Sequence, residues 1–108
     1  RSNLRNKMGL IDADFLGSYI ELFLEDTDRR LEILAESVSR GDMSVADRGC
    51  HALRGGCMEF GAERMSRLCE EMSAAAKSGD SVAVNSLFSR LQKEYLRLRP
   101  VYQSALTH

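Results

Sequence analysis

The stretch SRGD, residues 39–42, ends one apolar pattern and begins the next, and KSGD, residues 77–80, repeats the device. Glycine suits the left-handed position just after a helix, and aspartate suits the N-cap of the helix that follows. The two corners therefore divide the chain into long helices joined by short turns. Because short turns place consecutive helices side by side in opposite directions, we expect neighbouring helices to be antiparallel.

Apolar residues on both sides of these corners recur at steps of three and four, the period of an amphipathic helix. The pattern predicts helices from Asp12, over about 43–60, over about 62–78, and from Ser81 to Pro100, where the missing backbone donor predicts a kink or a stop. We expect a break or bend at residues 25–28. The prediction is an all-α, antiparallel up-down-up-down four-helix bundle with an additional short N-terminal helical segment.

The composition limits the function classes. The chain has 108 residues and a net charge of -1 at pH 7, whereas general nucleic-acid binders are strongly basic, so we expect no nucleic-acid partner. No apolar run approaches the roughly 18–20 residues of a membrane span, so we expect no membrane contact. We interpret residues 1–10 as a tail or linker without the apolar region of a signal peptide, and residues 11–108 as the helical domain.

The cysteines, Cys50, Cys57 and Cys69, are odd in number, which together with the missing signal peptide predicts free thiols and a cytoplasmic protein. Cys50 and Cys57 would lie about 10 Å apart along one helix axis, too far to share a zinc ion. We therefore expect neither a metal site nor a cofactor of the protein's own.

His51 stands in the most glycine-rich part of the chain, GCHALRGGCMEFGAERM, residues 49–65. On a helical wheel the apolar residues of this helix share one side, and His51 points about 150° away from the centre of that side. It should face solvent on the flank of the bundle. A neutral imidazole is a nucleophile near pH 7, so an exposed one is a candidate phosphate carrier.

The neighbours of His51 support this interpretation. Gly55, one turn later, leaves bare backbone beside the imidazole, although glycine costs a helix about 1 kcal/mol against alanine. Arg54 is a permanent cation suited to phosphoryl oxygens. The alternative is a histidine without a role, with Arg48 and Arg54 as ordinary surface charges. Those arginines would then pair with acidic neighbours such as Asp47 and Glu59.

The stretch HALRGGCMEFGAERMSRLCEEM, residues 51–72, resembles the signature of histidine-containing phosphotransfer (HPt) domains. That signature is a histidine, a small residue, a leucine or isoleucine, a lysine or arginine, a glycine and a small residue, with a further glycine about ten positions after the histidine. The resemblance extends over about residues 12–98. Arg54 stands where lysine is commoner, and Gly56 stands where serine is frequent.

The resemblance implies a phosphorelay intermediate of two-component signalling. His51 would accept a phosphoryl group, through Nε2, from the aspartyl phosphate of a receiver domain and pass it to the aspartate of another receiver. Arg54 would stabilise the phosphoryl group, and we expect no autonomous kinase activity. The receiver would supply Mg²⁺.

The implied partners are response-regulator receiver domains and a hybrid sensor histidine kinase, which could belong to the same parent chain. The expected docking surface comprises Arg48, Gly55, Met58, Phe15 and Tyr19. We expect a monomer, because one bundle uses up the apolar stripes. Two alternatives stay open: a non-catalytic helical interaction module, which a covered histidine would favour, and the phosphoacceptor domain of a chemotaxis-type histidine kinase, where the double glycine is commoner.

Overall fold

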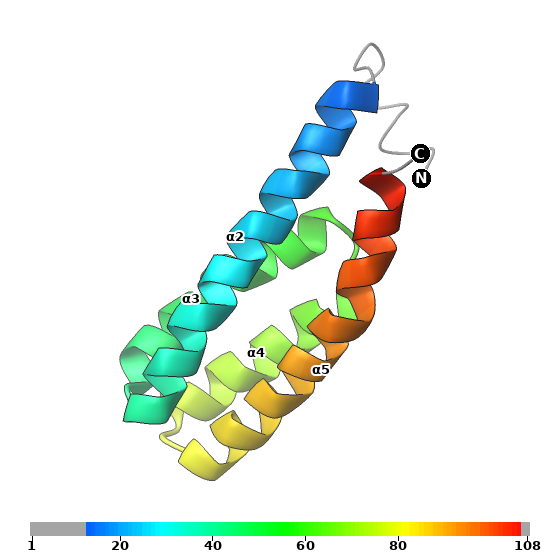
Figure 1. Cartoon of the computed structure of the whole chain (residues 1–108). Helices are drawn as coiled ribbons and strands as arrows, with labels where there is room; N and C mark the ends of the chain where they lie inside the picture. The colour runs from blue at the N-terminus through cyan, green and yellow to red at the C-terminus, as the bar shows by residue number, and fades with distance from the viewer. Residues whose placement is uncertain (1–12, 107–108) are drawn as a thin grey trace.

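Four α-helices make up the residues that the computed structural model describes, 13–106 (Figure 1). They are α2 (Ala13–Arg40), α3 (Met43–Glu59), α4 (Glu63–Lys77) and α5 (Ser81–Leu106). Each helix packs against the next and α5 also packs against α2, so the predicted all-α, four-helix bundle is confirmed. The predicted N-terminal helical segment and the tail over residues 1–10 lie outside the described residues.

The two glycine–aspartate corners form as predicted. Gly41 has a φ of +72°, its N–H and that of Asp42 return to carbonyls of the last turn of α2, and the Asp42 carboxylate accepts a hydrogen bond of 3.2 Å from the Val45 N–H. Gly79, with a φ of +74°, and Asp80 repeat these roles between α4 and α5. A positive φ is costly for side chains other than glycine, so both corners depend on the residue type.

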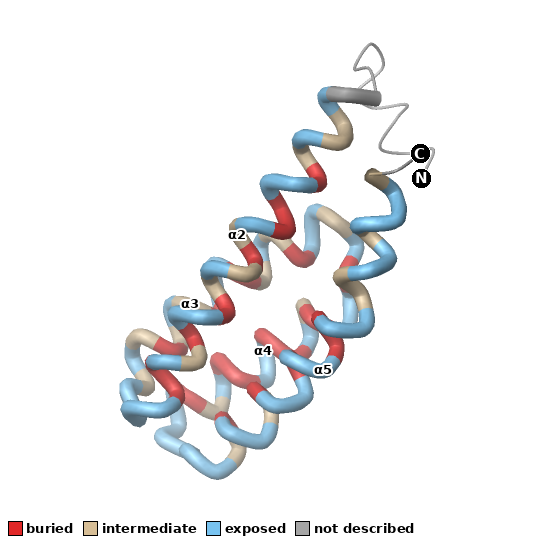
Figure 2. The backbone as a smooth tube through the Cα atoms, in the orientation of Figure 1, coloured by how far each residue is buried: buried red, intermediate tan, exposed pale blue. Residues whose placement is uncertain are grey.

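The core runs along the axis of the bundle, where all four helices turn their buried faces inward (Figure 2). Among its largest fully buried side chains are Leu34, Leu53, Met65, Met72, Val84 and Leu91. No helix within residues 13–106 is long and apolar enough to cross a membrane.

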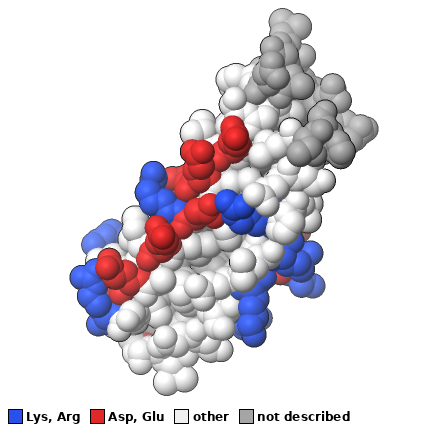
Figure 3. Space-filling model, viewed as in Figure 1, with Lys and Arg blue, Asp and Glu red and all other residues white. Residues whose placement is uncertain are grey.

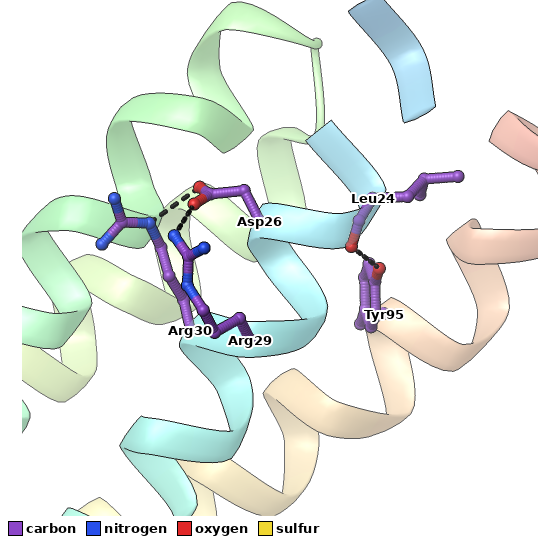
Figure 4. Close-up of polar contacts among 5 residues, drawn as sticks. All are labelled: Leu24, Asp26, Arg29, Arg30 and Tyr95. Carbon is purple, nitrogen blue, oxygen red and sulfur yellow. Dashed lines mark hydrogen bonds and ion pairs between the residues drawn. The ribbon is translucent and has the colours of Figure 1, made fainter. Parts of the chain in front are cut away.

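Of the break or bend expected at residues 25–28, the break is wrong, because α2 continues through this polar segment without interruption. Thr27 is buried in the bundle, and Asp26 forms ion pairs of 2.6 Å with Arg29 and 2.8 Å with Arg30, one turn later (Figure 4). Pairs at this spacing support a helix. Acidic residues also recur along α2 on its outer side, and Figure 3 shows them as a stripe.

The stop expected at Pro100 is also wrong, because α5 continues to Leu106. The hydroxyl of Tyr102 donates a hydrogen bond of 2.6 Å to the Phe60 carbonyl, and its ring packs edge-on against Phe23, with centroids 5.3 Å apart. These contacts hold the last turns of α5 against the bundle and offset the donor that proline removes. Val101, the residue after Pro100, is exposed.

Candidate functional site

His51 projects from the outer flank of α3, as the helical wheel predicts. Ala46, Cys50, Leu53 and Cys57 are buried on the opposite side of this helix. The His51 side chain is 55% exposed. The structure therefore does not have the covered histidine that would favour a bundle without phosphotransfer.

The glycines near His51 differ in their surroundings. A Cβ atom added to Gly55 would meet nothing within 4 Å, so the surface beside the imidazole is open. A Cβ at Gly56 would lie 3.7 Å from the Phe23 ring, and one at Gly49 would lie 3.4 Å from a Leu34 methyl group. Gly49 and Gly56 thus allow close packing of α3 on α2, which leaves Gly55 without a packing explanation.

Two acceptor groups face the Nε2 atom of His51. The hydroxyl oxygen of Ser73, on α4, lies 3.2 Å from Nε2, and the Oδ1 atom of Asp47, one turn earlier on α3, lies 3.3 Å from it. The same hydroxyl donates a hydrogen bond to Asp47 Oδ1. A helical wheel of α3 places Asp47 near His51, but it does not include Ser73, which belongs to α4. In the sequence, Ser73 is distinguished only by its position beside the apolar stripe of that helix.

Arg54 lies against α4. Its Nη2 atom forms an ion pair of 2.8 Å with Glu70, and its Nε atom is buried without a hydrogen-bond partner among the described residues. Arg48 instead bonds to a serine one turn earlier on its own helix. The pairings of these arginines with Asp47 and Glu59 that the alternative interpretation expected are therefore wrong, because Glu70 pairs with Arg54 and Ser44 bonds Arg48.

A family model described as the Hpt domain matches residues 18–100. The chain belongs to the Hpt domain family. Histidine phosphotransfer as an intermediate of a two-component phosphorelay is the function of this Hpt domain, and members of the family interact with receiver domains and kinases. A comparison with curated proteins gives no match.

Two solved structures share the fold of this Hpt domain. Histidine-containing phosphotransfer protein B (HptB) from Pseudomonas aeruginosa PAO1 superposes with a TM-score of 0.89 at 21% identity, over 98% of this chain and 89% of that one. The histidine-containing phosphotransfer protein ZmHP2 from maize superposes with a TM-score of 0.87 at 20% identity, over 97% of this chain and 77% of that one. At these identities the likeness establishes the bundle, and the site must be argued from its own residues.

A recess of about 210 Å³ lies between α3 and α4 beside the imidazole of this Hpt domain; its lining comprises Cys50, His51, Arg54, Cys69, Glu70 and Ser73. The cysteines are free thiols and all are buried. Burial, and to a smaller extent the charge of Asp47, raises the pKa of Cys50 to about 12, so this thiol is neutral at physiological pH. Within residues 15–106, no three histidine, cysteine or acidic side chains gather as metal ligands.

The expected docking residues on α3 lie close to the recess. Met58 is 58% exposed and lines, together with Arg54, a second hollow of about 460 Å³ between α3 and the start of α4. Arg48 is exposed on the other side of His51 along the helix. The structure thus brings His51, Arg54 and Met58 onto adjoining parts of one face.

The expected docking residues on α2 lie at the C-terminal end of α3. Phe15 is 52% exposed, so it is not part of the core. The half-buried Tyr19 packs between Phe15 and Phe60, with ring centroids 6.4 and 5.0 Å away, and its hydroxyl donates to Glu59. This hydrogen bond raises the pKa of Tyr19. Neither Phe15 nor Tyr19 lines the recess at His51.

Proposed function

We propose that His51 carries the phosphoryl group, which it receives from the aspartyl phosphate of one receiver domain and passes to the aspartate of another. The observation that carries the proposal is the exposed imidazole on α3 beside the open surface at Gly55. A receiver can bring its active site close to the imidazole on the flank where Gly55 presents no side chain. A neutral imidazole supplies the nucleophile near pH 7.

Arg54 is proposed to meet the negative charge of the transferred group. Its guanidinium is always charged and presents several donors in one plane, and its buried Nε has no partner among the described residues. The carboxylate that now pairs with it, Glu70, is 52% exposed. An ion pair with this much solvent access contributes under about 1 kcal/mol, so a phosphoryl group can displace it.

The proposed partners are response-regulator receiver domains and a hybrid sensor histidine kinase. Their docking surface would combine the open surface at Gly55 with Arg48 and Met58 on α3 and with Phe15 and Tyr19 on α2. The receiver would bring the Mg²⁺, since its own carboxylates face the phosphoryl group during transfer. We further propose a monomer in the cytoplasm, where the buried free thiols suit a reducing environment.

The test mixes the purified domain with a receiver that carries labelled phosphate and follows the label on a gel. We expect an acid-labile, base-stable label on the wild-type domain and none on a His51→Gln variant. A His108→Gln variant, which alters the chain's only other histidine, is the matched control and should keep the label.

A label that survives His51→Gln would overturn the assignment of the site. If no receiver of the source organism transferred its phosphoryl group to the domain, receivers would be rejected as donor and acceptor. The remaining interpretations would be an interaction module or the phosphoacceptor domain of a histidine kinase. A domain that is labelled only by a histidine kinase would favour the latter.

A further inference from the structure

The hydrogen bonds around Nε2 determine which nitrogen of His51 carries a proton. The Asp47 carboxylate can only accept hydrogen bonds, and the Ser73 hydroxyl already donates its proton to that carboxylate. Both groups therefore turn lone pairs toward Nε2, at 3.3 and 3.2 Å. A nitrogen between two acceptors must be a donor, so Nε2 carries the hydrogen and the lone pair of the neutral ring lies on Nδ1.

This arrangement masks the nitrogen that the resemblance to HPt domains makes the acceptor. Nε2 has no lone pair for attack while it bears the proton. The space along its N–H direction is also taken by the Ser73 and Asp47 oxygens, where a phosphorus atom would have to sit. The imidazole must therefore turn before Nε2 can meet an aspartyl phosphate.

The surroundings allow the ring to turn. The His51 side chain is 55% exposed, and its Nε2 atom is held only by a long hydrogen bond of 3.2 Å to Ser73 and an ion-pair contact of 3.3 Å to Asp47, which lie at or beyond the long end of the normal hydrogen-bond range. Asp47 and Ser73 stay bonded to each other when the ring leaves, so neither polar group loses its last hydrogen-bond partner. The open surface at Gly55 lies on the same flank of α3 and leaves room for the turned ring.

We propose that Asp47 and Ser73 form a latch, which holds the Nε2–H of His51 in the recess between α3 and α4, and that transfer begins from the ring turned out of it. The proposal rests on His51 as the phosphoacceptor. Asp47 and Ser73 are positioning residues, since they act on the phosphoryl group only through the imidazole.

The reaction balances without a further reactant. When the ring turns out, Nε2 gives its proton to water and Nδ1 takes one from water, which restores a neutral imidazole with its lone pair on Nε2. That lone pair then forms the N–P bond while the P–O bond to the receiver aspartate breaks and the carboxylate keeps the electron pair. The reverse steps return the ring to the latch after the phosphoryl group leaves.

The first test is ¹⁵N NMR of the free domain with labelled histidine. The wild-type His51 should be mainly the Nε2–H tautomer when neutral. Ser73→Ala and Asp47→Asn should each shift the ring toward a mixture of tautomers. Ser86→Ala, at an exposed position of α5, and Asp26→Asn on α2 are the matched controls and should leave the spectrum unchanged. A tautomer ratio that is the same in all five proteins overturns the latch.

The second test is the single-turnover rate of transfer from a phosphorylated receiver. Both latch variants should accept the group faster, by roughly three- to tenfold, the size of one or two partly exposed hydrogen bonds lost from the starting state. An unchanged or slower rate overturns the latch. So does ³¹P NMR that finds the phosphoryl group on Nδ1, because Nε2 would then never leave its acceptors.

The two proposals fail separately. A wild-type domain labelled on His51, with latch variants that behave like the controls, retains the phosphoacceptor and rejects the latch. A label on another residue rejects the phosphoacceptor, while the tautomer ratio of the free domain still decides whether the latch exists.

Discussion

Two aspartates, Asp28 and Asp47, each contact a hydroxyl on a neighbouring helix and a nitrogen-bearing side chain. Asp28, on α2, accepts a hydrogen bond of 2.6 Å from the Tyr95 hydroxyl and two from Arg99, of 3.1 and 2.6 Å, all from α5. The Tyr95 hydroxyl also lies 3.2 Å from the Leu24 carbonyl (Figure 4). Asp47 accepts from the Ser73 hydroxyl and faces the imidazole of His51.

The difference lies in the nitrogen group. Arg99 binds Asp28 with two donors in one plane and carries a permanent charge, an arrangement that fixes geometry and performs no chemistry. The pKa of Asp28 is lowered, first of all by this hydrogen-bonded pairing. His51 meets Asp47 through one donor that a tautomeric change can remove. The same aspartate motif thus serves as a permanent clamp between α2 and α5, whereas at α3 and α4 the bond from Ser73 to Asp47 persists and only the hold on the His51 imidazole is releasable.

The largest expected effect is on stability at the α2–α5 clamp. Asp28→Ala removes the carboxylate that pairs with Arg99 and leaves the Tyr95 hydroxyl with only the Leu24 carbonyl, so we expect the free energy of unfolding to fall by about 1–2 kcal/mol, with an allowance for partial solvent exposure. Chemical denaturation measures this change. Asp47→Ala should lower the free energy of unfolding by less than half as much. Equal losses in the two variants would show that the two aspartates do not differ in their contribution to stability.

The arginines of the two regions should separate stability from transfer. Arg54→Ala removes the cation beside the recess, so transfer from a phosphorylated receiver should fall by roughly tenfold, which corresponds to about 1.4 kcal/mol. Arg54→Lys should recover part of this loss, because the charge remains. Arg99→Ala should lower the denaturation midpoint and leave the transfer rate within about twofold. If a fully folded Arg99→Ala domain accepted the phosphoryl group slowly, Arg99 would contribute to transfer as well as to stability, which would contradict this prediction.

Gly55 allows a smaller test in which stability and transfer move in opposite directions. Gly55→Ala should stabilise the domain by up to about 1 kcal/mol, because α3 gains helix propensity and the added methyl group meets nothing. The same methyl group should slow transfer several-fold if receivers approach this surface closely. Gly56→Ala, whose Cβ would face Phe23, is the control and should leave the rate unchanged. Equal rates for the two variants would remove Gly55 from the docking surface.

Most of the fold could be predicted because its signals are local. The corners need a left-handed residue followed by a capping side chain, and Gly41 with Asp42 supplies both within one turn. The helix predicted over about 43–60 is Met43–Glu59. Pro100 misled because its missing donor is a local signal, whereas the bond from Tyr102 to the Phe60 carbonyl that holds the helix beyond it joins distant residues.

The site could be predicted only as far as one helix allows. A wheel fixes the side from which His51 emerges, since that depends on the apolar residues of α3 alone. It cannot say which residues of α4 lie opposite, because the register between two helices is set by side-chain packing in three dimensions. For this reason, only the structure shows that Ser73 and Glu70 belong to the site. Both change its chemistry, because Ser73 contacts the imidazole of His51 and Glu70 pairs with Arg54.

The smallest expected effect is the acid sensitivity of the α2–α5 clamp. The folded-state pKa of Asp28 lies below its ordinary value of about 4, so its contribution to stability is present above that value and is lost as the pH falls toward the folded-state pKa. The Asp28 side chain is 41% exposed, and solvent screening keeps this contribution under about 1 kcal/mol.

The measurement is the free energy of unfolding, from denaturation at a series of pH values between pH 5 and pH 2, about the range in which carboxylates titrate. As the pH is lowered, this free energy should decrease less steeply for Asp28→Asn than for the wild type. Glu94→Gln should also flatten the curve, because Arg97 lowers the pKa of Glu94. An Arg99→Ala domain that kept the full wild-type slope would show that Arg99 is not the source of the Asp28 shift, and the permanent clamp would lose the electrostatic feature that distinguishes it from the one at His51.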